Sequence, residues 1–184
     1  MFFEDEQEAA EWPRDMAIRV SDGSSLLPLL WLRHHAIGNA EPSLPPAALP
    51  GEPVSSADAV LVGRWEQLWK RALDHVRLVQ ELDPRSMSER FDLWSMPSIS
   101  ALTDAVDLEV NTGVSLWRAS LNAAPGAERA VTDSLRLAWE RGLRVVLELP
   151  LSALFEARLS GASLVVSAVT RRDRGRYSGA LKRF

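Results

Sequence analysis

The sequence of 184 residues contains no cysteine. This absence excludes disulfide bonds, thiolate metal sites and cysteine nucleophiles, and it fits a reducing compartment. The glycines do not cluster either, and no segment has the spacing G-x-x-x-x-G-K-[ST] or G-x-G-x-x-G. The chain therefore has no recognisable loop for cradling the phosphates of a nucleotide.

Long apolar runs are absent as well. The most apolar stretch, Leu26–Leu32, is about a third of the length that a bilayer span requires, and it contains Pro28. The N-terminal segment is acidic, whereas a secretory signal needs basic residues and a longer apolar run. We therefore expect a cytoplasmic protein. Only two of the 21 basic residues are lysine, and together with the many alanines this skew indicates a GC-rich bacterial genome.

What is present resembles an ordinary globular protein, with 46% hydrophobic and 25% charged residues. We expect one domain over residues 1–184, with an acidic N-terminal arm at 1–15 and a proline-rich connector at 41–54. The five prolines of the connector prevent a regular element. A proline-rich ligand for an aromatic groove is the alternative, but the basic residue that orients many such ligands is missing.

The clearest element is a long helix from Ser55 to Leu82. Ser55 or Ser56 can cap its first turn, and Asp83-Pro84 ends it. Its apolar residues recur at steps of three and four, which is the spacing of one helix face. They are Leu61, Trp65, Leu68, Trp69, Ala72, Val76, Val79 and Leu82.

Other segments alternate between strand and helix patterns. Strands are predicted at 16–20, 144–149 and 162–170, an edge strand at 176–181, and a hairpin around the turn at 111–113. Helices are predicted at 24–38, 98–105, 127–139 and 152–159. The expected fold class is α+β: a mixed or antiparallel sheet, with strands mainly in the C-terminal half, packed against the long central helix and two or three shorter helices.

Candidate catalytic chemistry is sparse. His34 and His35 are adjacent, so their side chains diverge and do not chelate a metal as a pair. Ser152 follows a predicted strand that contains Glu148, but no G-x-S-x-G elbow surrounds it. We predict no catalytic residue, no metal site and no cofactor, and keep a small hydrolase near Glu148 and Ser152 as the weakest alternative.

The two ends of the chain are opposite in charge. Residues 1–15 carry six acidic residues and one arginine, whereas residues 171–184 carry six basic residues and one aspartate. Arginines with an aromatic between them can bind phosphates and stack on bases, so the C-terminal turn is a candidate site for nucleic acid or an acidic partner. The candidate residues are Arg171, Arg172, Arg174, Arg176, Tyr177, Lys182 and Arg183. The alternatives are a solvated hairpin tip and an ion-paired contact with the acidic arm.

Tryptophan is abundant, with seven residues against one tyrosine. Trp65 and Trp69 share one face of the long helix, and their apolar neighbours favour a place in the core over one in a partner surface. Trp12 and Trp94 lie in charged loops, which makes them candidates for a partner surface.

These observations favour a non-enzymatic protein that acts by association, either with itself as a homo-oligomer or with another protein. The overall charge of −4 gives the whole molecule no reason to seek nucleic acid or an anionic membrane. A nucleic-acid-binding accessory protein that uses the basic C-terminal turn is the alternative hypothesis.

Overall fold

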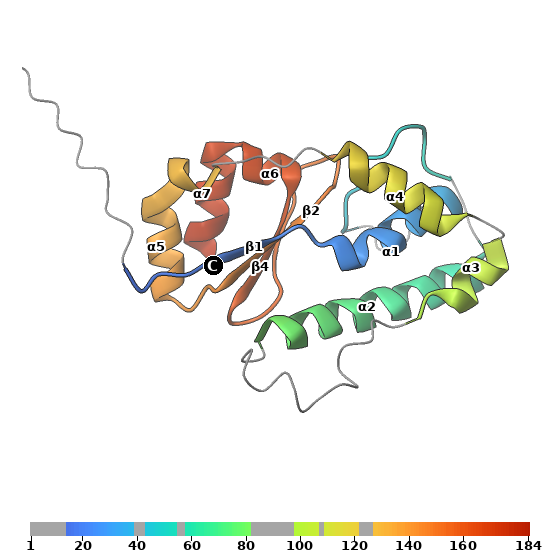
Figure 1. The fold of residues 1–184 in the computed structure, drawn as a ribbon, viewed down its shortest axis with the longest axis horizontal. Coiled ribbons are helices and arrows are strands. Elements are labelled where there is room, and N and C mark those ends of the chain that lie inside the picture. Colours follow the sequence, from blue (N-terminus) through green and yellow to red (C-terminus); the bar gives the residue numbers. More distant parts are fainter. Residues whose placement is uncertain (1–13, 39–42, 55–57, 82–97, 107–108, 122–126) are drawn as a thin grey trace, which may run out of the picture.

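A four-stranded sheet runs through the middle of the molecule, with the strand order β1-β2-β4-β3 (Figure 1). Strands β1 (Arg19–Ser21), β2 (Val145–Leu149) and β4 (Ser163–Ser167) are parallel, and β3 (Glu156–Arg158) pairs antiparallel with β4. This computed structural model describes residues 14–38, 43–54, 58–81, 98–106, 109–121 and 127–184. The expected α+β class with a mixed sheet, and with strands mainly in the C-terminal half, is confirmed.

Helices cover both faces of the sheet, because β2 and β4 are apolar on both sides. In β2, Val146 packs into one buried cluster, whereas Leu147 and Leu149 pack into the other. The first cluster lies under α5 (Thr132–Glu140) and α7 (Arg174–Arg183). The second lies under the helices on the opposite face, which are α1 (Leu27–Leu32), α2 (Ala59–Glu81), α3 (Ser100–Val106) and α4 (Val110–Ser120) (Figure 1).

The first helical segment has the predicted extent and begins as η1 (Ser24–Leu26). Pro28 lies in the first turn of α1, where its missing N–H costs no hydrogen bond. The segment ends as a π-helix, η2 (Arg33–Ile37), and Gly38 follows with φ of 74°. Gly23 is favoured before it, because its φ is 59° and a Cβ at this position would lie 2.9 Å from the Glu148 carbonyl oxygen.

The long helix α2 is confirmed. Its first turn is supported by Asp58, whose Oδ1 accepts a hydrogen bond from the Val60 N–H at 2.8 Å. Trp65 and Trp69 are buried, and their rings stack with centroids 5.4 Å apart. Trp65 Nε1 also donates to the Leu29 carbonyl at 2.7 Å. The two tryptophans are therefore core anchors. The predicted cap at Ser55 or Ser56 and the stop at Asp83-Pro84 lie outside the described residues.

The hairpin prediction around residues 111–113 is wrong, because this segment forms α4. The helix buries Trp117, whose Nε1 donates to the Ala48 carbonyl at 3.1 Å. Gly113 does not form a turn here. A Cβ on this residue would approach Cζ2 of Trp31 to 2.5 Å, so glycine allows α4 to pack closely against α1.

Two further predictions near the C-terminus are wrong. Segment 152–159 contains β3 instead of a helix, and the predicted edge strand at 176–181 lies within α7. Asp173 separates α6 (Ala168–Arg172) from α7 and caps α7, since its Oδ1 accepts from the Arg176 N–H at 2.9 Å. The buried residues of α7 recur at helical spacing. They are Tyr177, Ala180 and Leu181, and Phe184 directly after the helix is buried as well.

The remaining helix predictions are confirmed. The segment at 98–105 forms α3, and the segment at 127–139 forms η5 (Ala127–Val131) followed by α5. Gly142, with φ of 112°, ends the second of these as predicted. Among the described helices, none is both long enough and apolar enough to span a bilayer.

Candidate functional site

Positive charge is concentrated in the C-terminal part of the chain. Residues 127–184 carry eleven basic and six acidic residues, whereas residues 1–126 carry ten basic and nineteen acidic residues. The helices of the C-terminal part lie together on one face of the sheet (Figure 1). Their exposed basic residues, which we call the cationic layer, are Arg129, Arg136, Arg172, Arg174, Arg176, Lys182 and Arg183. The fold thus places the cationic layer on the side of the sheet opposite α2, which carries the exposed Arg64, Lys70, Arg71 and Arg77 of its own.

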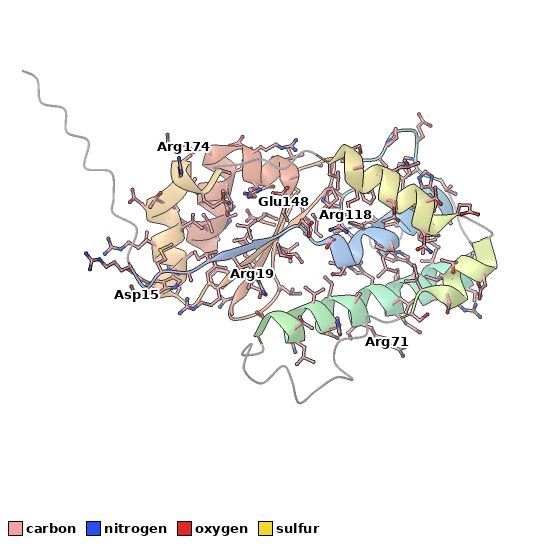
Figure 2. The ribbon with its side chains drawn as sticks, in the orientation of Figure 1. Asp15, Arg19, Arg71, Arg118, Glu148 and Arg174 are labelled. Atoms are coloured by element: carbon pink, nitrogen blue, oxygen red, sulfur yellow. The ribbon has the colours of Figure 1, made fainter. Side chains whose placement is uncertain are left out.

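Two of the predicted binding residues are buried instead of exposed. Arg171 is only 8% exposed and forms a bidentate pair with Glu128, at 2.8 Å from Nε to Oε1 and 2.9 Å from Nη2 to Oε2. Its Nη1 donates to Glu148, which projects from β2 toward α6 (Figure 2). Burial opposes the charge, but the hydrogen bonds that Arg171 donates to Glu128 and Glu148 outweigh this effect and raise the pKa of Arg171. Arg171 therefore joins η5, β2 and α6.

Tyr177 belongs to the same buried network. It is 0% exposed, and its hydroxyl donates to Glu128 Oε1 at a distance of 3.5 Å. Burial, followed by the negative charge of Glu128, raises the pKa of Tyr177 well above its usual value. A ring buried in this way cannot stack on a base. The predicted nucleic-acid site therefore lacks its aromatic residue.

The other residues predicted for the C-terminal turn are exposed. Arg183 forms a bidentate pair with Glu156 of β3, at 2.6 Å and 2.7 Å, and this hydrogen bonding raises the pKa of Arg183. Arg174 lies at the outer edge of the cationic layer, on the opposite side of the molecule from Arg71 of α2 (Figure 2). Lys182, Arg172 and Arg176 are exposed on α6 and α7. Trp12 and Trp94 lie outside the described residues.

The groups of the hydrolase alternative are not brought together. Glu148 faces the α6 side of the sheet, where it pairs with Arg171. Ser152 instead contacts the proline-rich connector, since its Oγ donates to the Pro46 carbonyl at 3.1 Å. The two side chains thus take partners from different elements, and neither activates the other in this geometry.

The histidines are dispersed between two helical segments. His34 and His35 lie on η2, with ring centroids 4.8 Å apart, and His75 lies on α2. Burial, and then the neighbouring His34, lowers the pKa of His35. Within the described ranges, no group of three or more His, Asp or Glu side chains is arranged to hold a metal ion.

Sequence reasoning missed three contributors to this face of the molecule. Arg129 and Arg136 extend the cationic layer, and Glu128 binds Arg171 and Tyr177. A charge count over the whole C-terminal part would have found the two arginines. Nothing in the sequence indicated Glu128, because it lies 43 positions from Arg171.

Comparison of the chain with protein-family models, with curated proteins and with solved structures finds no match.

Proposed function

We propose that this protein acts by association, through the cationic layer, with an acidic protein segment. The observation that supports this is the concentration of exposed basic side chains in one helical layer. Seven exposed basic residues share this helical layer, against the exposed Asp133, Glu140 and Asp173 beside them, and the acidic excess in the sequence belongs to residues 1–126. Complementary potentials of this kind raise association rates and select the partner.

A second copy of the chain is the partner that the charges favour. Residues 1–15 carry six acidic residues, and the described chain begins next to the cationic layer, where Asp15 lies beside α5 (Figure 2). Met16 is buried in the cluster that α5 and α7 cover. Because this acidic sequence joins the described chain beside the cationic layer, we infer that it is the segment which the cationic layer of a second copy binds.

Charge reversal tests the proposal. Arg174→Glu with Arg176→Glu reverses two charges in the first turn of α7, where acidic residues are compatible with the helix dipole. Arg71→Glu with Arg77→Glu makes the same change in net charge on exposed residues of α2. We expect a solution mass above 20.4 kDa for the wild type and the α2 variant, and 20.4 kDa for the α7 variant.

The association is also expected to weaken with salt, since screening shortens the range of exposed charges to about 8–10 Å near physiological ionic strength. Two results together would refute the proposal. These are a wild-type monomer in sedimentation and the absence of a stoichiometric partner in a pull-down from nuclease-treated lysate.

Nucleic-acid binding is a second candidate, favoured by Arg172, Arg174 and Arg176 at the α6–α7 junction. It predicts an affinity for a labelled oligonucleotide that falls steeply with salt and that the α7 variant loses. An affinity that neither salt nor the α7 variant changes would exclude it. The burial of Tyr177 removes one stacking group from this candidate.

A further inference from the structure

A cavity lies between α2, the proline-rich connector and the β3–β4 half of the sheet, on the face that α2 covers (Figure 1). Its volume is about 510 Å³, which is within the range of about 300–1,000 Å³ that is typical of small-molecule sites. We call it the α2 cavity. Its apolar lining residues are Leu44, Trp69, Leu73, Leu149, Phe155, Leu159 and Val165, and its polar lining residues are Ser43, Glu66 and Lys70.

The floor of the α2 cavity belongs to the core of the protein. Trp69, Leu149 and Val165 are at most 6% exposed, and all three are members of the same buried cluster. Water beside such residues finds few hydrogen-bond partners, so its release by an apolar ligand is favourable. The floor is therefore suited to a ligand with an apolar body.

The helical wall of the cavity is a single strip of α2. Glu66, Trp69, Lys70 and Leu73 are separated by three or four positions, which places them together on the helix surface. Trp69 is held by Trp65, because the two rings stack 9° from parallel. An aromatic side chain that is already fixed loses little entropy when a ligand binds.

Hydrogen bonds to the β4 region fix the wall that is formed by Phe155 and Leu159, on either side of β3. The Phe155 N–H donates to Ser167 Oγ at 3.1 Å and to Thr170 Oγ1 at 2.9 Å. The Leu159 N–H donates to the Ser163 carbonyl at 2.9 Å. This wall is thus held by contacts within the protein and exists before a ligand binds.

The connector forms the remaining wall. Leu44 is 4% exposed, and its carbonyl accepts a hydrogen bond from the guanidinium of Arg33. Arg33 also donates to the Pro45 carbonyl at 2.7 Å, and proline fixes φ of the backbone there. The α2 cavity is therefore preformed on three sides, which lowers the entropic cost of binding.

The charges at the α2 cavity balance. Glu66 and Lys70 are exposed, so they mark the mouth of the cavity, and one carboxylate with one ammonium gives the lining no net charge. Neither an anion nor a cation is favoured by such a mouth. A charged group deeper in the cavity would lose its hydration among apolar side chains, which is costly without a charged partner.

From this arrangement we propose that the α2 cavity binds an uncharged, largely apolar small molecule. The body of the ligand contacts Trp69, Phe155 and the floor, and any polar end remains at the mouth beside Glu66 and Lys70. This site is separate from the association that we propose for the cationic layer, which lies on the other face of the sheet.

The test uses the full chain with two uncharged probes, N-phenylnaphthylamine and octanol. Anilinonaphthalenesulfonate and octanoate are their charged counterparts, with the same rings or the same chain. We expect saturable fluorescence enhancement with N-phenylnaphthylamine, displacement of this probe by octanol, and a rise in melting temperature, because a ligand stabilises the state that it binds. The charged counterparts should bind about tenfold more weakly or worse, since their charge finds no buried partner.

Leu73→Trp locates the site. The larger side chain occupies part of the cavity, so the affinity for N-phenylnaphthylamine should fall about tenfold or more. Leu78→Trp is the matched control, because Leu78 lies on the same helix, is 38% exposed and does not line the cavity, so this variant should keep the wild-type affinity. If Leu73→Trp does not fold, Leu159→Trp fills the cavity from the opposite wall.

Three results would overturn the proposal. The first is that neither uncharged probe binds the wild type in a saturable way. The second is that the charged counterparts bind as tightly as the uncharged probes. The third is unchanged affinity for N-phenylnaphthylamine in a folded variant whose cavity is filled by tryptophan, which would place the probe elsewhere on the protein.

Discussion

Replacing Arg171 by methionine should destabilise the protein strongly. Methionine keeps much of the apolar stem but removes the guanidinium, which leaves Glu128 and Glu148 without their shared cation. The side chain of Arg171 is 9% exposed, and those of Glu128 and Glu148 are 23% and 16% exposed. The two carboxylates would therefore face each other in a poorly solvated region.

The magnitude follows from this burial. Removing one partner of a buried ion pair costs about 3–5 kcal/mol, and the partial exposure of the two carboxylates favours the lower end of that range. We expect a loss of about 3 kcal/mol in the free energy of unfolding. At about 2–4 °C per kcal/mol for a chain of this size, the melting temperature should fall by about 6–12 °C.

Denaturant and thermal unfolding, followed by circular dichroism, measure this loss. Arg176→Met is the control, because Arg176 is exposed on α7, and it should change stability by less than about 0.5 kcal/mol. Combining Arg171→Met with Glu128→Gln and Glu148→Gln removes the unpaired charges and should restore most of the loss. An Arg171→Met variant within about 1 kcal/mol of the wild type would refute the role that we assign to the network.

Three further predictions concern single residues. Tyr177 is the only tyrosine, so phenolate absorbance reports it alone. Because its pKa is raised above 10.0, the phenolate should appear only as the protein unfolds, and stability should fall as pH rises above that value; ordinary titration in the folded protein would contradict this. Gly113→Ala should destabilise by about 1 kcal/mol, since overpacking against Trp31 outweighs the gain in helix propensity. The control is Gly63→Ala on α2, where nothing lies within 4 Å of the new Cβ, and it should stabilise the protein by about 0.5–1 kcal/mol. If chemical denaturation gives the same change in unfolding free energy for both variants, the contact of residue 113 with Trp31 is unimportant. The pKa of His35 is lowered from 6.5, so the unfolded chain takes up the proton first and stability should decrease as pH falls below 6.5. His35→Gln should reduce this loss of stability at low pH. If the variant and the wild type show the same pH profile of the unfolding free energy, His35 is not its cause.

Local sequence patterns were enough to predict several of the helices and strands. The apolar stripe of α2, the turn before α1 with the proline in its first turn, and the β-branched run of β4 each predicted the correct kind of element. The predicted strand at 162–170 was too long, however, because residues 168–170 belong to α6. These features act over a few neighbouring residues, through helix and strand periodicity and through the restricted backbone of proline. The same reasoning correctly assigned Trp65 and Trp69 to the core.

Only the tertiary structure decided the remaining elements. Gly113 lies within a helix because its missing Cβ lets Trp31 approach, and a turn signal in the sequence does not contain that contact. Segment 156–158 becomes a strand because it pairs with β4, which local propensity alone does not predict.

The candidate site follows the same division. The charge of the C-terminal residues was evident from the sequence, but their separation into exposed and buried members was not. Arg171 is buried because Glu128 and Glu148, 43 and 23 positions away, meet it on one face of the sheet. Trp69 and Phe155 line one cavity because the fold brings α2 beside β3. Such contacts join residues distant in the chain, so composition and spacing determined which side chains are present, and packing determined which of them are available to bind.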